Sequence, residues 1–319
     1  LRPAPEAGTV ARLLRAHVPG LKPLVPVSEL RTSGMDVTSP GLNCNDSAFI
    51  QSTSGSTGNP KGVVLTHANL LANIRAMGQA VKAGPEDVFV SWLPLYHDMG
   101  LIGAWLGSLY FSMLLVVMSP LSFLARPERW LWTIHRYRGT LSASPNFGYE
   151  YCLKRLRDED LQGLDLNSWR AAFNGAEAIS PDTLQQFEAR FANYGFHAGA
   201  MMPVYGLAES SVGLAFPPLG RGAVIDRIER TTFMHSGQAN AEPGTGTQAL
   251  RFVSSGSPLA GHQIRIVNTA GQELPERQQG RLEFRGPSST SGYYRDADNT
   301  RTLFHQDWLD SGDLAYIAN

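Results

Sequence analysis

The most constraining feature of this sequence is an alternation of short apolar runs with longer amphipathic segments across its central part. The apolar runs are Val88–Trp92, Leu114–Met118, Ala171–Phe173 and Met201–Val204. The segments with helical periodicity are His67–Lys82, Pro127–Tyr137, Phe147–Arg157 and Pro181–Ala192. This alternation favours βαβ units, because parallel neighbours need a crossover connection between them. The pattern therefore predicts an α/β fold with a largely parallel sheet and helices on both faces.

The sequence pattern changes after Pro218. Short runs broken by Gly and Pro follow, at Leu250–Val253, Gln263–Val267 and Gly280–Phe284. Such runs are typical of antiparallel strands, so we expect a second, β-rich subdomain. Ahead of these strands, Ser236–Thr247 is rich in Gly, Ala and Thr and predicts an irregular loop.

Charge, cysteine content and hydropathy limit the partners and the cellular compartment that we expect for this chain. The 319 residues carry 27 Lys plus Arg against 28 Asp plus Glu, a net charge of -1, which gives no reason to expect a nucleic-acid partner. Cys44 and Cys152 are the only cysteines, which favours a reducing, cytoplasmic compartment. Met99–Ala125 is uncharged, but its Gly, Ser and Pro residues favour a buried helix at Leu101–Phe111 and a strand at Met113–Met118. We therefore expect no stable membrane insertion.

The strongest chemical signal is the loop Ser52–Gly62, with the sequence STSGSTGNPKG. Its small and hydroxylated residues let successive backbone N–H groups point into one concavity that suits phosphate oxygens. Lys61 adds a positive charge. The loop is not a Walker A motif, because Pro60 precedes the lysine and no Ser or Thr follows it. A flexible linker would not need Pro-Lys-Gly directly before the apolar run Val63–Leu65, so the pattern indicates a phosphate site.

This loop resembles the phosphate-binding signature of the adenylate-forming superfamily, which includes acyl-CoA synthetases, nonribosomal peptide adenylation domains, luciferases and fatty acyl-AMP ligases. Later segments match other signatures of the family in the same order. These segments are Trp92–Gly100, Asn174–Glu177, Tyr205–Glu209, Gly280–Gly286 with Gly292-Tyr293, and Asp310–Leu314. One mild departure is Ser311, where the family usually shows Thr before Gly-Asp. The matches run from residue 52 to residue 314 and cover nearly the whole chain.

The resemblance implies a site for ATP and Mg²⁺. The residues it assigns to the nucleotide are Thr53, Ser54, Gly55, Ser56, Thr57, Gly58, Gly175, Ala176, Glu177, Tyr205, Gly206, Leu207, Ala208 and Asp313. Tyr205 is expected to stack on adenine and Asp313 to accept hydrogen bonds from the ribose. Lys61 is assigned to the phosphates as a catalytic residue. Glu209 is the expected Mg²⁺ ligand, because hard carboxylate oxygens suit that ion.

His97 is the third expected catalytic residue. In the family such a histidine lines the acyl pocket and positions the carboxylate, although a purely structural histidine is an open alternative. Together with Asp98, Asn146 and Phe147 it forms the expected acyl-binding set. The Asp98 carboxylate has a second interpretation as the cap of a helix that begins at Met99.

The implied reaction is the attack of a carboxylate oxygen on the α-phosphorus of ATP, with loss of pyrophosphate and formation of acyl-AMP. It needs no acid–base residue of its own, because positioning and charge stabilisation carry the step. The chain is therefore expected to be part of an acid–thiol ligase, in which a thiol later accepts the acyl group.

Several features resemble the fatty acyl-AMP ligase branch of the family. They are Ser142–Glu150, the Leu207-Ala208-Glu209 form of the Tyr-Gly signature, and the long interval from Pro217 to Leu250 followed by Val253–Gly261. In that branch an extra segment near this place disfavours the domain rotation that CoA needs. We therefore expect a long-chain fatty acid as substrate and an acyl carrier protein as acceptor. Candidates for the pocket wall are Trp105, Leu109, Phe147 and Tyr151, but they are equally ordinary core residues. The alternatives are a long-chain fatty acid–CoA ligase and a nucleotide-binding module without activity.

The expected organisation has three parts. Residues 1–90 form a partial first α/β subdomain with the phosphate loop, and residues 91–217 form a second α/β subdomain with a flavodoxin-like sheet. Residues 218–319 form a β-rich subdomain, a distorted barrel with an insertion. A helix is expected at Val10–His17 and an extended segment at Leu21–Val27. We expect the family's small C-terminal domain to be absent, so that the chain alone is weakly active.

Overall fold

The computed structural model describes residues 41–53, 60–242 and 249–318. The segments expected at Val10–His17 and Leu21–Val27, the centre of the phosphate loop and the end of the loop expected at Ser236–Thr247 lie outside these residues. Residues 43–319 form one compact unit, and all contacts described below lie within it. The subdomain limits expected at residues 90 and 217 remain predictions.

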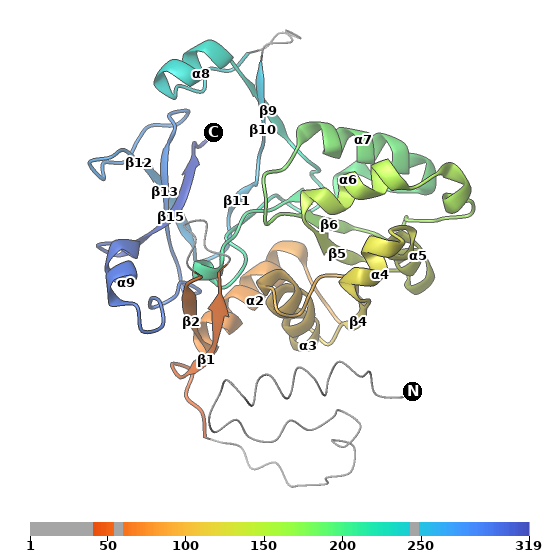
Figure 1. The fold of residues 1–319 in the computed structure, drawn as a ribbon, viewed down its shortest axis with the longest axis horizontal. Coiled ribbons are helices and arrows are strands. Elements are labelled where there is room, and N and C mark those ends of the chain that lie inside the picture. The colour runs from red at the N-terminus through yellow and green to blue at the C-terminus, as the bar shows by residue number, and fades with distance from the viewer. Residues whose placement is uncertain (1–40, 54–59, 243–248, 319) are drawn as a thin grey trace. The chain divides into compact units, whose positions relative to one another are not determined.

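A five-stranded parallel sheet forms the centre of the α/β part (Figure 1). Its strands are β3 (Val88–Ser91), β4 (Leu114–Val117), β5 (Leu141–Ser144), β6 (Ala171–Asn174) and β7 (Met201–Pro203). They pair in the order β4-β3-β5-β6-β7, and every pair is parallel. In chain order this is the 2-1-3-4-5 arrangement of flavodoxin-like folds, and the α/β prediction is confirmed.

The sequence did not predict β5, although it is the middle strand of this sheet. Its sequence is Leu-Ser-Ala-Ser, and all four residues are buried. The Ser142 hydroxyl donates to the carbonyl of Val90 (2.6 Å) and accepts from the indole N–H of Trp130 (2.8 Å). Because both contacts come from other elements, a search for local apolar runs could not find this strand.

Helices cover both faces of the sheet (Figure 1). On one side lie α2 (His67–Val81), the π-helical segment η2 (Met99–Leu106) and α3 (Gly107–Tyr110). Four further helices pack with the sheet strands into one large hydrophobic core. They are α4 (Pro120–Ala125), α5 (Glu128–Tyr137), α6 (Asn146–Arg155) and α7 (Pro181–Phe191). Where the sequence predicted one helix at Leu101–Phe111, a π-helical turn begins two residues earlier and runs into the short α3. None of the helices in the described ranges is long and apolar enough to cross a bilayer.

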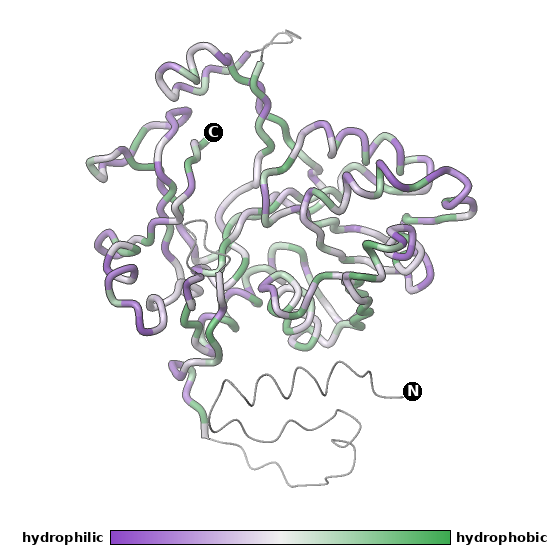
Figure 2. The backbone as a smooth tube through the Cα atoms, viewed as in Figure 1, coloured by the Kyte–Doolittle hydropathy of each residue, from purple (hydrophilic) through white to green (hydrophobic). Residues whose placement is uncertain are grey.

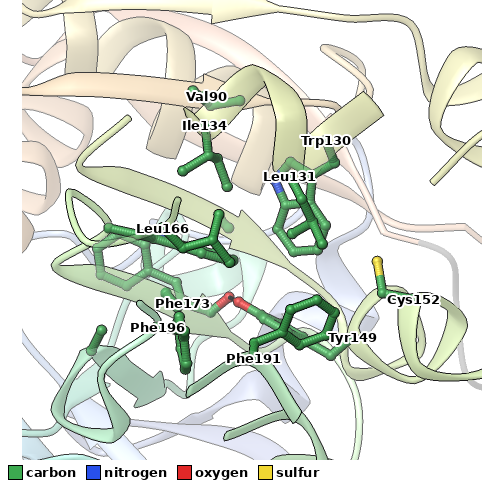
Figure 3. Close-up of a cluster of buried hydrophobic side chains, with 14 of the residues drawn as sticks. Val90, Trp130, Leu131, Ile134, Tyr149, Cys152, Leu166, Phe173, Phe191 and Phe196 are labelled. Atoms are coloured by element: carbon green, nitrogen blue, oxygen red, sulfur yellow. Dashed lines mark hydrogen bonds between the residues drawn. The ribbon is translucent and has the colours of Figure 1, made fainter. Parts of the chain in front are cut away.

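Aromatic side chains fill the core between α5, α6, α7 and the sheet (Figure 3). Trp130 packs edge-on against Tyr149 and Trp169, at centroid distances of 5.4 and 5.3 Å. The Tyr149 hydroxyl donates to the backbone carbonyl of Phe173 (2.8 Å), so this buried phenol has a partner. Such a close-packed aromatic core holds the parallel sheet rigidly.

Residues 47–52 and 62–66, expected within the first α/β subdomain, form an antiparallel ladder. The strands after Pro218 form the predicted antiparallel β-rich part. Its main sheet has the order β12-β13-β15-β14, with β12 (Gln263–Val267), β13 (Gly280–Arg285), β14 (Phe304–His305) and β15 (Trp308–Ala315). Two-stranded ladders pair β1 (Ser47–Ser52) with β2 (Gly62–Thr66), β8 (Ala215–Phe216) with β11 (Ser257–Pro258), and β9 (Ile225–Ile228) with β10 (Leu250–Val253). Two further helices are α8 (Arg230–Ser236) and α9 (Ala297–Leu303). In Figure 2 the edge strand β4 is apolar and α9 is polar.

Short 3₁₀ turns complete the described structure, at Asp158–Leu161, Ala192–Tyr194, Ala198–Ala200 and Ala208–Ser210. The last of these, η6, carries Glu209.

Candidate active site

A cavity of about 1170 Å³ brings together most of the residues that the sequence assigned to one site. The assigned residues that line it are Thr53, Lys61, His97, Asp98, Ala176, Tyr205, Gly206, Leu207, Ala208, Glu209 and Asp313. Ser54, Gly55, Ser56, Thr57 and Gly58 lie outside the described residues. Segments more than 250 residues apart in the chain therefore meet around one space.

The ends of the phosphate loop are held together by the β1–β2 ladder, in which Ser52 pairs with Gly62. The backbone N–H of Thr53 donates to the carbonyl of Lys61 (2.9 Å), and the N–H of Lys61 donates to the Thr53 hydroxyl (3.3 Å). This closure places the lysine at the cavity wall, at the end of a rigid antiparallel ladder.

Tyr293 links Lys61 to Glu209, the expected metal ligand, and the sequence did not predict this contact. The Lys61 ammonium lies over the Tyr293 ring, 4.9 Å from its centroid. The Tyr293 hydroxyl donates to Oε1 of Glu209 at 2.8 Å. Burial, followed by the nearby Glu209 carboxylate, raises the pKa of Tyr293 well above its usual value, so the phenol stays a donor. The only available signal was its place in the Gly292-Tyr293 motif.

Buried polar side chains hold the turn that carries Glu209. Ser211 has φ 66° and ψ -64°, the geometry of a strained γ-turn, and its hydroxyl donates to the carbonyl of Ser288 (3.0 Å). Asn73 bonds both the N–H and the carbonyl of Gly213, at 3.0 and 2.7 Å. These contacts from α2 and the β-rich part fix a conformation that the local chain would not hold alone.

Tyr205 and Asp313, both expected to contact the nucleotide, lie together at the cavity wall. The Tyr205 hydroxyl donates to Oδ2 of Asp313 at 2.6 Å. Burial and this hydrogen bond raise the pKa of Tyr205 well above its usual range. Next to it, a Cβ on Gly206 would lie 1.7 Å from the carbonyl oxygen of Val212, so this position requires glycine.

The expected adenine turn follows the end of β6. Ala176 lines the cavity with φ 69°, an unusual conformation for a residue with a side chain. A Cβ on Gly175 would lie 2.9 Å from a methyl group of Val204, so β6 and β7 approach closely here. The Glu177 carboxylate accepts from the backbone N–H of Phe147 at the start of α6 (2.6 Å), which holds the turn against that helix.

His97 and Asp98 lie at the start of η2. His97 Nδ1 is 2.8 Å from Oδ1 of Asp98, and the same oxygen accepts from the N–H of Met99 (2.7 Å). The Asp98 hydrogen bond raises the pKa of His97 above its ordinary value, which favours the protonated imidazolium. Asp98 thus caps its helix and also orients His97.

Asn146 and Phe147 do not line the cavity. Asn146 is buried, and its side-chain oxygen accepts from the Asn174 amide (3.3 Å) and from the N–H of Ser180 (3.2 Å). Phe147 packs edge-on against Trp92, at 5.7 Å between centroids, and is 41% exposed. In this structure both residues contribute to packing behind the turn that was expected to contact adenine.

The other lining residues include polar ones, such as Gln51, Asn299 and Asp310, and a set of apolar ones, which we call the apolar arm. Its lining residues are Ile74, Met77, Gly78, Val81, Ala83, Phe89, Gly103, Gly107, Phe111, Met113, Leu141, Ala143, Phe173 and Phe216. None of these described residues is charged or carries a polar side chain. Phe173 stacks on Phe89 (6.5 Å) and contacts Phe216 (5.7 Å), so an aromatic wall runs along one side. The sequence assigned none of these residues to the site.

The donor set fits Mg²⁺ only with help from a ligand. Glu209 offers a half-buried carboxylate at the cavity, and the described residues contain no group of three or more His, Cys, Asp or Glu side chains that could hold a metal. Mg²⁺ is commonly held by one or two carboxylates together with substrate phosphates, which is what this site can provide.

The comparison with known families agrees with this geometry. Residues 9–294 match the model of the AMP-binding enzyme family, and the chain belongs to this family. The adenylate-forming assignment made from the motifs is therefore confirmed.

Individual relatives are fatty-acid ligases. The chain is 38% identical over 281 residues to the medium-chain-fatty-acid–[acyl-carrier-protein] ligase JamA of Moorena producens, covering 87% of this chain and 47% of that ligase. A structure from a study of the fatty acyl-adenylate ligases of E. coli and L. pneumophila is 39% identical with a TM-score of 0.84, over 89% of this chain and 52% of that one. The L. pneumophila fatty acyl-adenylate ligase in complex with acyl adenylate and pyrophosphate is 36% identical with a TM-score of 0.83, over 88% and 50%. The chain thus spans about half the length of these relatives.

Proposed function

We propose that this chain carries the adenylation site of a fatty acyl-AMP ligase, which uses ATP to convert a fatty acid into acyl-AMP and pyrophosphate. The observation that supports this most is the single cavity, in which a polar end with Lys61, Glu209 and Asp313 continues into an uncharged apolar arm. An amino acid or a sugar acid would leave polar groups unpaired in such an arm, whereas an aliphatic chain would not.

The residues then act by positioning and by charge. Tyr205 and Asp313 hold the adenosine, and Lys61, fixed by the β1–β2 ladder, balances negative charge on the phosphates. The His97 imidazolium, oriented by Asp98, holds the fatty-acid carboxylate at the point where the polar end meets the apolar arm. Glu209, oriented by Tyr293, would hold Mg²⁺. When bound, that ion neutralises phosphate charge.

We further propose that an acyl carrier protein, in the cytoplasm, accepts the acyl group. The interval expected to restrain domain rotation contains β9 and α8 and ends at Leu250, the first residue of β10. Asp226 of β9 pairs with Arg277 (3.0 Å) and accepts from the Tyr316 hydroxyl (2.8 Å), and Arg251, directly after the interval, pairs with Asp182 of α7 (2.6 Å). The interval and the strand that follows it are thus tied to the β-rich part and to α7. A long-chain fatty acid–CoA ligase is the alternative. It would be favoured if the protein that contains this chain formed abundant acyl-CoA, unchanged by deletion of residues 236–247.

The test of the adenylation step is ATP–pyrophosphate exchange by the protein that contains this chain, with fatty acids, amino acids and aromatic acids as substrates. Exchange that depends on fatty acids is expected. Exchange with amino acids alone, or no exchange with any acid, would contradict the proposal.

A further inference from the structure

The cavity extends from the carboxyl ends of the parallel strands toward their amino ends. His97, Ala176 and Tyr205 follow the carboxyl ends of β3, β6 and β7, and all three line the polar end of the cavity. Phe89 lies in the first half of β3 and Leu141 is the first residue of β5, so both are near the amino ends of their strands. Because all five strands are parallel, these two sets mark opposite ends of the cavity.

Phe111 lies at the far end of the arm. It follows α3 directly, two positions before the cavity-lining Met113, which in turn precedes the first residue of β4. Val81, the last residue of α2, and Ala83, which lies between α2 and β3, also line the cavity. The residues around Phe111 thus come from the turns that lead into the amino ends of the strands.

The Phe111 ring is seated on the backbone of Gly78. A Cβ built on Gly78 would lie 2.1 Å from Cζ of Phe111 and 2.2 Å from one of its Cε atoms. The ring therefore occupies the space that any larger residue of α2 would need. Gly78 is three residues from the end of α2, where glycine is otherwise unfavourable for a helix.

A second contact fixes the ring from the side. Tyr110 packs edge-on against Phe111, at 4.9 Å between centroids, and the Tyr110 hydroxyl accepts from Nε of Arg75 (2.8 Å). Arg75 lies on α2 one turn before Gly78. Helix α2 thus holds the ring directly, through Gly78 at the Cζ end of the ring, and indirectly, through Tyr110.

We infer that Phe111, seated on Gly78, closes the acyl arm and sets the longest fatty acid that the site accepts. The inference rests on the proposed function and adds a residue that determines specificity. A chain that reaches the ring must stop or displace it, and displacement is opposed by Gly78 on one side and Tyr110 on the other. Acids that end before the ring bind without steric conflict.

The test is the dependence of kcat/KM on chain length, measured by fatty-acid-dependent pyrophosphate exchange from hexanoate to octadecanoate. Phe111→Ala should raise kcat/KM by about tenfold or more for acids two carbons beyond the wild-type limit, because each methylene in an apolar pocket discriminates on this scale. Phe111→Leu should give an intermediate profile. Activity toward shorter acids should stay within about threefold of wild type.

Gly78→Ala should act in the opposite direction. Its methyl group pushes the ring into the arm, so the limit should fall by about two carbons. The double variant Gly78→Ala/Phe111→Ala should regain the longer limit, since no ring is left to displace. Leu109→Ala is the matched control, because this residue of α3 is 71% exposed and does not line the cavity.

The outcomes separate the two claims. Unchanged chain-length profiles in folded, active Phe111→Ala and Phe111→Leu variants would overturn the role of Phe111 while leaving the proposed function intact. A folded wild-type protein that activates no fatty acid of the series would contradict the proposed function, and this inference with it. A shift caused equally by Leu109→Ala would also overturn the inference.

Discussion

The two ends of the cavity are built in different ways. The polar end consists of turns with unusual backbone geometry, such as Ala176 and Ser211 with positive φ, and of charged side chains fixed by specific partners. The apolar arm consists of regular helices and strands whose side chains share only their lack of charge. Recognition of a phosphate or a ribose depends on exact placement of donors, whereas an aliphatic chain needs only volume and shape. Substitutions at the polar end should therefore reduce activity toward every acid, and substitutions in the arm should change the choice among acids.

The largest effect should follow removal of charge at the polar end. Lys61→Ala and Glu209→Ala should each reduce fatty-acid-dependent pyrophosphate exchange by about 10²- to 10³-fold, because each group stabilises charge that develops during transfer. The reduction should be the same for short and long acids. Exchange within about threefold of wild type in both folded variants would remove these residues from the reaction.

Two glycines that line the cavity provide a matched pair. In Gly206→Ala the new methyl group would meet the Val212 carbonyl oxygen at 1.7 Å, so the backbone that carries Tyr205 must move. AMP affinity, measured by calorimetry, should fall by about tenfold or more. Gly103→Ala, in η2 beside the arm, has no atom within 4 Å of the new methyl group and should keep AMP affinity unchanged. Equal losses in the two variants would contradict the difference drawn between the ends.

A smaller effect should follow Tyr293→Phe, which keeps the ring below Lys61 and removes only the hydrogen bond to Glu209. The Mg²⁺ concentration that gives half-maximal exchange should rise by about three- to tenfold, or about 0.7–1.4 kcal/mol. This is a part of the about 1.5–3 kcal/mol that a hydrogen bond to a charged group contributes in total. Tyr293→Leu removes both contacts and should cost more. If Tyr293→Phe left the Mg²⁺ dependence unchanged, the link from Tyr293 to Glu209 would have no role in metal binding.

The smallest effect concerns protonation at the junction of the two ends. Asp98→Asn should lower the pKa of His97 toward its ordinary value, because the carboxylate that favours the imidazolium is lost. In the wild type this pair stabilises the fold below the ordinary histidine pKa of about 6.5, and the contribution is lost as pH rises through the raised value. Titration of His97 followed by NMR in both proteins measures the shift. An unchanged pKa would show that Asp98 does not control the charge of His97.

The same contrast explains what the sequence could predict. Lys61, Tyr205, Glu209 and Asp313 were assigned to one site because their chemistry requires particular residues in short motifs, and the structure brings these four to one cavity. Their roles remain predictions. The parallel sheet and the β-rich part followed from local periodicity in the same way.

The rest depends on contacts between distant elements. Strand β5 was not predicted because Ser142 looks like a surface residue in the sequence, and its burial depends on partners in β3 and α5. The apolar arm was not predicted because Phe89, Phe111 and Phe173 resemble ordinary core residues in the sequence. Only the fold shows that they line a cavity. Tyr293 was visible in a motif, but its partners were not.

The central claim is that one cavity holds the nucleotide at one end and an aliphatic chain at the other. Calorimetric titration of the protein that contains this chain with non-hydrolysable acyl-AMP analogues of increasing chain length tests it most directly. Affinity should exceed that of AMP and rise by about fourfold for each buried methylene, which corresponds to about 0.8 kcal/mol, until the chain reaches Phe111. Affinity that is independent of chain length, or no binding of any analogue by the folded protein, would contradict the account.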